Sequence, residues 1–292
     1  MKLTNIYNLP QPVVDAVTND PYNKGEADYS ITGLLQPPQK TALFTRYNDE
    51  ITEDVSDRVA SLIGQVAHGI LERAEREAWA ERRFFTVWAG KRISGSVDRM
   101  LYYKGELSDY KTCKAWKAKL ALEGDIAEWT AQVNGYIALL HDNGIEVKTA
   151  RVIPIILDWA KRQAHRDDKY PPHPLLSIPI EIWPRDKTIA YFSTRIALHE
   201  GVKGMNTEDI HIAYPCSEKD RWKRPDQYAV KKKGTARAIK IYDNIIQAQE
   251  HVNLGGEEYS LEHRVSESIR CEDFCSSQPF CKQYQQAKNG NR

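Results

Sequence analysis

The spacing of apolar residues predicts a helix followed by three strands in the middle of the chain. From residue 54 to about residue 83, apolar side chains recur every three or four positions, which is typical of an amphipathic helix. Apolar and polar residues then alternate over 84–89 and 92–103, and a third such run covers 107–112. Alternation of this kind indicates strands, so we expect an antiparallel arrangement with short turns.

The same patterns continue to about residue 200. A helix is expected over 117–140, and an almost continuously apolar run at 149–159 predicts a buried strand. A polar loop, a further strand and a further helix are expected at 160–175, 176–183 and 186–200. This order of elements predicts an α/β fold with a mixed central sheet flanked by helices.

The two ends of the chain differ from this middle part. Residues 1–45 are rich in proline and polar residues and predict loops with a short helix near residues 13–17. After residue 204 the sequence becomes polar and basic, with one expected helix near 242–252. We therefore expect a loop-rich extension packed on the core, the core itself, and a basic C-terminal segment that forms one structural unit with the core. Their boundaries are 1–53, 54–204 and 205–292.

Composition narrows the choice of partner. The 292 residues are 41% hydrophobic, which is enough for a packed core, and 41 Lys and Arg nearly balance 40 Asp and Glu. DNA binding would therefore depend on a local basic surface and not on net charge. The N-terminus lacks a long apolar run, and no segment approaches about 18 apolar residues, so we expect a cytoplasmic protein with no membrane partner.

Two aspartates and a lysine mark the strand pair around the Lys104-Gly105 turn. Asp109 and Lys111 lie two residues apart and share one face of a strand, and a hairpin would bring Asp98 beside them. Such groups are costly to bury together unless they hold a metal. Phosphodiester hydrolysis needs metal-binding carboxylates and a nearby cation, and the carbonyl of Tyr110 could add an oxygen. The alternative is a surface hairpin with solvated charges.

Polar residues on the two helices beside these strands add further candidates. His68 and Glu72 lie one turn apart on the first helix and could bind a metal, or His68 could be a hydrogen-bonded structural histidine. Gln132 and Tyr136 share one face of the helix that follows the third strand. They could contact phosphate or metal-bound water, or Tyr136 could simply pack in the core.

Four segments in this order resemble the motif series of RecB-type nucleases of the PD-(D/E)xK superfamily. The segments are Gly64–Glu72, Gly95–Asp98, Asp109–Thr112 and Gln132–Tyr136, and the resemblance covers about residues 54–160. It implies a restriction-endonuclease-like PD-(D/E)xK core. It also implies roles for six residues: metal binding by His68, Asp98 and Asp109, orientation of the attacking water by Lys111, and lining of the site by Gln132 and Tyr136.

The activity implied by the resemblance is that of an Mg²⁺- or Mn²⁺-dependent DNA exonuclease. It would hydrolyse phosphodiester bonds at the ends of linear DNA and leave a 5′ phosphate. The expected setting is phage DNA recombination, repair or degradation in the cytoplasm of a bacterial host cell, with a phage single-strand annealing or recombination protein as a possible partner. Two alternatives remain open: a DNA-binding recombination accessory protein with an inactive nuclease core, and a structure-specific endonuclease.

Cysteines form a second candidate site. An odd total of five speaks against a disulfide framework, while Cys271, Cys275 and Cys281 lie within eleven residues. With Cys216 as the fourth ligand, they could bind zinc or an iron–sulfur cluster. Cys113 is expected to be a small buried residue. The arrangement resembles that of iron–sulfur RecB-type nucleases, such as CRISPR-associated exonucleases, and favours a [4Fe–4S] cluster, although the family's upstream cysteine is missing.

Two basic segments contain aromatic residues, a combination that suits nucleic-acid binding. The first contains Lys114, Trp116 and Lys117 and directly follows the third expected strand. The second contains Arg221 and the run Lys231, Lys232 and Lys233, and it also resembles the tail of phage-borne nucleases. Either segment could instead be ordinary solvated surface.

Overall fold

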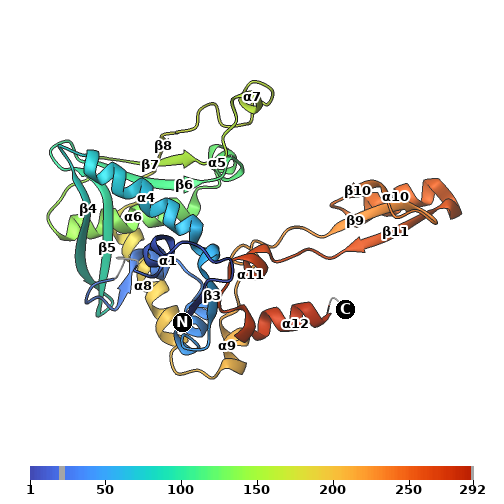
Figure 1. Ribbon diagram of the computed structural model, residues 1–292, viewed down its shortest axis with the longest axis horizontal. Helices are drawn as coiled ribbons and strands as arrows, with labels where there is room; N and C mark the ends of the chain where they lie inside the picture. The colour runs from blue at the N-terminus through green and yellow to red at the C-terminus, as the bar shows by residue number, and fades with distance from the viewer. Residues whose placement is uncertain (20–23, 291–292) are drawn as a thin grey trace. The chain divides into compact units, whose positions relative to one another are not determined.

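The computed structural model describes residues 1–19 and 24–290, and the chain divides into two compact units. The first unit comprises Met1–Gln36 and Thr52–Lys203, and the second comprises Pro37–Ile51 and Gly204–Arg292. Figure 1 shows the elements of both units in chain order. The second unit thus combines a short N-terminal segment with the C-terminal part of the chain.

A mixed sheet forms the centre of the first unit, as the sequence predicted. Its strands run in the order β2 (Tyr29–Ser30), β5 (Lys91–Leu101), β6 (Glu106–Cys113), β7 (Thr149–Ile156) and β8 (Ile178–Pro179), with β4 (Trp79–Trp88) also paired to β5. The β2–β5 and β6–β7 pairs are parallel, and the other pairs are antiparallel. Because β6 and β7 are parallel neighbours, the chain crosses between them through helices.

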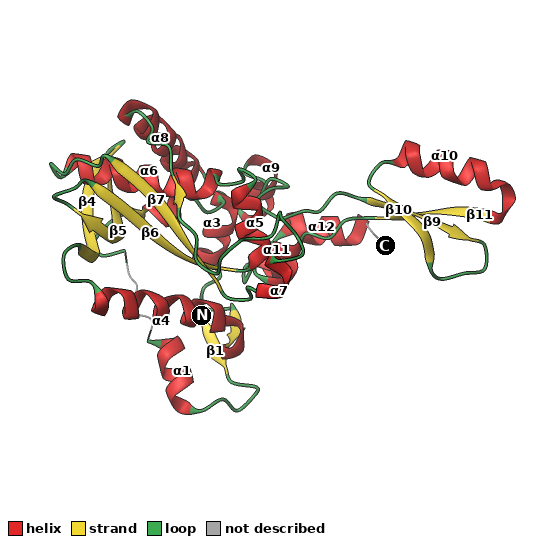
Figure 2. Cartoon of the chain, turned by 90° about the horizontal axis from the view of Figure 1, so that it is seen from above, coloured by secondary structure: helices red, strands yellow, loops and turns green. Residues whose placement is uncertain are grey.

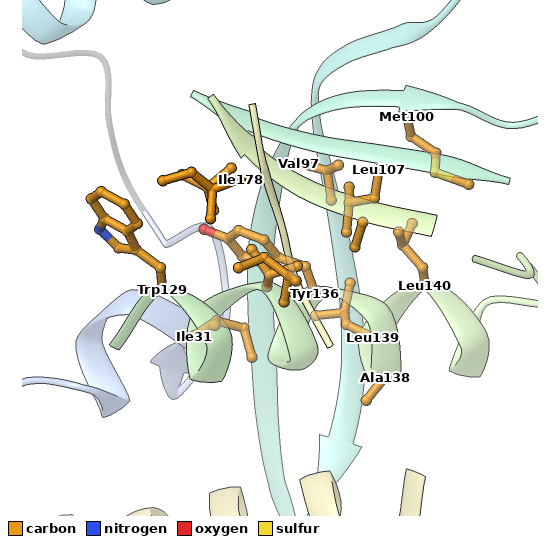
Figure 3. Close-up of a cluster of buried hydrophobic side chains, with 14 of the residues drawn as sticks. Ile31, Val97, Met100, Leu107, Trp129, Tyr136, Ala138, Leu139, Leu140 and Ile178 are labelled. Atoms are coloured by element: carbon orange, nitrogen blue, oxygen red, sulfur yellow. The ribbon is translucent and has the colours of Figure 1, made fainter. Parts of the chain in front are cut away.

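Helices flank both faces of this sheet. Helix α4 (Val59–Ala74) runs along one face, and α6 (Ala127–Asp142) lies on the other, with α8 (Arg185–Gly201) packed against α6 (Figure 2). The core lies between α6 and the strands, where Tyr136 and Leu139 point towards Val97 and Leu107 (Figure 3). Apolar residues of α4 behave differently: none is buried, and Val66 is 53% exposed.

Three boundaries differ from the predicted ones for local reasons. Helix α4 ends at Ala74, because the side chain of Glu75 accepts the backbone N–H groups of the next three residues at 2.9–3.1 Å. The predicted helix 117–140 is two helices, α5 (Ala115–Leu122) and α6, separated where Gly124 has a φ of +100°. Finally, only Ile178–Pro179 of the predicted strand 176–183 pairs with a neighbour.

Short elements complete the first unit. The predicted N-terminal helix is present, and β1 pairs in parallel with β3. Their bounds are β1 (Lys2–Thr4), α1 (Gln11–Thr18), α2 (Ile31–Leu34), β3 (Thr52–Asp54), η1 (Val55–Arg58) and α7 (Lys161–Ala164). No helix in the described part of the chain is both long and apolar enough to cross a membrane.

The second unit contains a small antiparallel sheet that the sequence did not reveal. Its strands lie in the order β10 (Ala238–Tyr242), β9 (Gln227–Lys232) and β11 (Tyr259–Arg264), and α10 (Ile245–Gly255) contacts all three. The remaining elements are α3 (Pro38–Arg46), α9 (Thr207–Ala213), η2 (Gly256–Glu258), α11 (Ile269–Asp273), η3 (Gln278–Phe280) and α12 (Lys282–Gly290). Strand β9 (QYAVKK) has no alternation of buried and exposed residues, so no strand pattern distinguished it from a polar loop.

Candidate metal centre and cysteine pocket

The candidate metal centre lies in an opening where strands β5 and β6 separate from one another. On one edge, β5 pairs with β2 only at Ile93–Ser94 and with β6 only over Arg99–Leu101. Between these points, residues 95–98 have no strand partner on that edge within the described part of the chain. The two strands are therefore not joined by ladder hydrogen bonds at the level of Asp98 and Asp109, and side chains occupy the space between them.

Asp98 is buried in this opening. Its Oδ2 atom accepts the backbone N–H of Tyr110 at 2.7 Å, while its Oδ1 atom lies 3.8 Å from His68 Nδ1. Burial, together with the negative charge of Asp109, raises the pKa of Asp98 to about 7. The N–H and C=O of one strand residue point to the same side, so the carbonyl of Tyr110 also faces Asp98.

Glu81 completes a group that the sequence analysis missed. Its Oε1 atom lies 2.7 Å from His68 Nδ1, and this hydrogen bond raises the pKa of His68. One ligand atom each from His68, Glu81 and Asp98 lie within 4.8 Å of one another, which is close enough to share a metal ion. Glu72, the neighbour considered from the sequence, is not part of this group.

The turn between β4 and β5 could have revealed Glu81. Ala89 and Gly90 form a two-residue turn with φ values of +49° and +71°, and Trp88 pairs with Lys91. Counting back along both strands from this turn sets Glu81 opposite Asp98. Glu81 itself has a φ of +47°, a conformation that is uncommon for residues other than glycine.

Asp109 lies beside this group with its own partners. Its Oδ2 atom is 2.6 Å from Lys111 Nζ, and its Oδ1 atom accepts a hydrogen bond from Gln132 Nε2 at 3.2 Å. Gln132 also donates to the hydroxyl of Tyr136 at 3.0 Å. Burial alone would lower the pKa of Lys111, but Asp109 and Asp98 outweigh it and raise that pKa. Lys111 is therefore held as a cation beside two carboxylates.

Four of the five cysteines line one pocket in the second unit. Cys216 follows α9, Cys271 lies in α11, Cys275 comes shortly after, and Cys281 immediately precedes α12. Cys113 is partly buried on β6 in the first unit. The structure thus brings together the four cysteines that the sequence predicted as one ligand set.

Burial and mutual repulsion govern the protonation of these thiols. Burial, and then the negative charges of neighbouring thiolates, raise the pKa of Cys216 to about 12 and that of Cys271 to about 11. Burial also raises the pKa of Cys281, although the backbone N–H groups of Gln283 and Tyr284 oppose this effect. A bound cationic centre would remove the repulsion, so the donor set fits a thiolate-bound metal.

The predicted DNA-binding residues are scattered over different environments. Lys114 directly precedes α5, Trp116 is 56% exposed, and Lys117 forms an ion pair with Asp125 at 3.4 Å. In the second unit, Arg221 lines the cysteine pocket.

The lysine run of the second unit is largely paired with β11 and the residue before it. Lys231 forms an ion pair with Glu262, and Lys232 forms one with Glu258 at 3.3 Å. Lys233 donates its backbone N–H to the carbonyl of Glu258. These partners reduce the positive charge that this segment offers to a phosphate backbone.

Comparison with known proteins identifies a weakly similar solved structure and no family. No protein-family model matches the sequence, and no curated protein matches it. Among solved structures, that titled "Crystal structure of SSO0001" is similar, with a TM-score of 0.46 and 14% sequence identity. The match covers 64% of this chain and 84% of that one. An identity and a TM-score this low establish neither a family nor a function.

Proposed function

We propose that the protein is a metal-dependent nuclease of the PD-(D/E)xK type that hydrolyses phosphodiester bonds at the ends of linear DNA. The observation that carries this proposal is the opening between β5 and β6. There, Asp98 lies beside the Asp109–Lys111 ion pair and within reach of His68 and Glu81. A solvated surface hairpin would not bury two carboxylates and surround them with a histidine, a lysine and a glutamine.

The donor set fits a divalent cation. His68, Asp98 and Glu81 would hold it, with Asp109 next to them, and oxygen-rich sets of this kind suit Mg²⁺ or Mn²⁺. When bound, the metal would supply a Lewis acid and lower the pKa of a coordinated water. Lys111 would offset the charge that develops on the phosphate, and Gln132 would keep Asp109 in place.

The cysteine pocket supports a second part of the proposal, a [4Fe–4S] cluster held by Cys216, Cys271, Cys275 and Cys281. The four cysteines line one pocket, and four thiolates suit a cube in which each binds a different iron. The resemblance to iron–sulfur nucleases favours this centre over zinc, which four thiolates could also bind. A brown protein after anaerobic purification would support the cluster, and a colourless protein with stoichiometric zinc would refute it.

Incubation of linear and circular plasmid DNA with the purified protein, with and without EDTA, tests the nuclease proposal. We expect Mg²⁺-dependent loss of the linear DNA only. Loss of both forms would indicate an endonuclease. Binding to DNA without any cleavage would indicate an accessory protein with an inactive core and would contradict the proposal.

A further inference from the structure

Gln39 carries a side-chain amide into the cysteine pocket from a distant part of the sequence. It lies on α3 and is only 1% exposed. Its Nε2 atom is 3.3 Å from the sulfur of Cys281 and 3.7 Å from that of Cys216. Both distances are suitable for N–H···S hydrogen bonds, so the amide faces two of the four predicted ligands.

A second glutamine fixes the position of this amide. Gln39 Nε2 also donates to Gln283 Oε1 at 3.0 Å, so its second N–H is shared by the two sulfur atoms, of which that of Cys281 is the nearer. Gln283 in turn accepts the backbone N–H of Cys216 at 2.9 Å and donates to the carbonyl of Cys216 at 2.8 Å. Gln39, Gln283 and Cys216 therefore form one connected network.

Contacts of α3 with the C-terminal part of the same unit hold Gln39 from the other side. The ring of Tyr47 stacks on that of Phe280, with the ring centroids 4.2 Å apart. Ser277 Oγ donates to the carbonyl of Lys40 at 3.3 Å. The Oε1 atom of Gln39 is buried and has no hydrogen-bond partner among the described residues. A buried polar atom without a partner is unfavourable, so packing alone would favour an apolar side chain at this position.

We propose that Gln39 is a positioning residue that shares one N–H between the thiolates of Cys281 and Cys216 and raises the reduction potential of the cluster. This inference rests on the proposed cluster. Reduction adds one electron to the cluster and increases the negative charge on its sulfur ligands. Hydrogen bonds to sulfur stabilise that added charge, so the reduced form becomes more favourable.

The test compares Gln39→Leu with Gln278→Leu in the full-length protein. Gln278 lines the same pocket but donates no side-chain hydrogen bond to sulfur in the described structure, so it is a matched control. Anaerobic redox titration, followed by visible absorption and electron paramagnetic resonance, gives the potential. Iron analysis during exposure to a chelator gives the rate of iron loss. We expect a lower potential and faster iron loss for Gln39→Leu, and wild-type values for Gln278→Leu.

Equal potentials and equal rates of iron loss for Gln39→Leu and the wild type would overturn the inference. If Gln39→Leu does not fold, Gln39→Glu replaces it, because a carboxylate cannot donate N–H and should lower the potential further. A wild-type protein that contains no iron would overturn the cluster and this inference together. DNA digestion by the same preparations is scored separately. Loss of digestion with an intact cluster would count against the nuclease proposal alone.

Discussion

At the scale of single residues, the buried carboxylate of Asp98 is costly to keep ionised in the metal-free protein. The carboxylate is buried beside Asp109, and Lys111, the more distant His68 and the N–H of Tyr110 compensate its charge only in part. Burial and repulsion together raise its pKa to about 7. A buried charge that is only partly compensated is unfavourable, and a bound cation would remove that cost.

Asp98→Asn should therefore stabilise the metal-free protein at pH 8 while abolishing Mg²⁺-dependent cleavage. The pKa is about 7 in the folded protein and near 3.8 in the unfolded chain, so the folded state binds this proton more tightly. The free energy of unfolding then falls as pH rises from about 4 to about 7. We expect the variant to gain about 1–3 kcal/mol at pH 8 in EDTA and nothing near pH 4, as measured by urea unfolding.

Asp109→Asn is the control for this experiment, because Asp109 has an ion-pair partner in Lys111. This variant should lose stability at pH 8, since it removes the carboxylate 2.6 Å from Lys111 Nζ and leaves this ammonium with only the weaker charge interaction with Asp98. A destabilised Asp98→Asn variant at pH 8 would contradict the proposed environment of Asp98.

Glu81→Gln should weaken Mn²⁺ binding about 10–100-fold, which is the usual effect of removing a carboxylate that binds a metal or orients a metal-binding histidine. The 2.7 Å contact with His68 is the reason to expect this loss. Isothermal titration calorimetry gives the affinity. Glu72→Gln, on the same helix as His68, is the control and should bind Mn²⁺ like the wild type. An unchanged affinity for Glu81→Gln would remove Glu81 from the site.

At the scale of elements, helix α6 contributes side chains both to the hydrophobic core and to the candidate metal centre. Tyr136 packs its ring against β5, and its hydroxyl accepts a hydrogen bond from Gln132, which also donates to Asp109. The close approach requires a glycine on β5, because a Cβ atom on Gly95 would lie 2.9 Å from the Tyr136 ring. The position of Asp109 therefore depends on packing behind the strand.

Gly95→Ala should destabilise the protein by about 1–3 kcal/mol, since the Tyr136 ring would have to move out of a packed core. Urea unfolding monitored by tryptophan fluorescence measures the change. Gly69→Ala on α4 is the matched control: nothing lies within 4 Å of its added Cβ, so it should stabilise the helix by about 0.5–1 kcal/mol. Equal stability of Gly95→Ala and the wild type would contradict the packing described.

The elements also show what the sequence could and could not predict. Apolar residues at regular spacing located β5, β6 and α6, although all three are buried on more than one face. The expected positions of Asp98, Asp109 and Gln132 beside one another followed from these strands and this helix. Glu81 escaped because it lies in a stretch read as helix, which Glu75 in fact ends early. Contacts between segments far apart in the chain, such as that of Gln39 with Cys281, leave no local pattern at all.

At the scale of the whole molecule, the cysteines draw together parts of the second unit that are distant in sequence. Between Cys216 and Cys281 lie 64 residues, which include a three-stranded sheet and α10. A metal centre bound by both cysteines would stabilise the folded state. Folding closes this long loop at a cost in chain entropy, and the free energy of metal binding would offset that cost.

Cys216→Ser should lower both the iron content and the melting temperature of the anaerobically purified protein. The matched control is Cys113→Ser, since Cys113 lies on β6 and is not one of the four pocket cysteines. Iron analysis and differential scanning calorimetry provide the two measurements. An unaltered iron content in Cys216→Ser, or iron loss in Cys113→Ser, would contradict the assigned ligand set.

We propose that the opening between β5 and β6 is a nuclease site. The rate at which Asp109→Ala and Lys111→Ala digest linear DNA in Mg²⁺ tests this most directly. Lys111 stands 2.6 Å from Asp109, so each variant removes one half of a pair at the proposed reaction centre. We predict that both variants lose digestion while they still bind DNA in a gel-shift assay. Wild-type rates of digestion in both variants would contradict the claim.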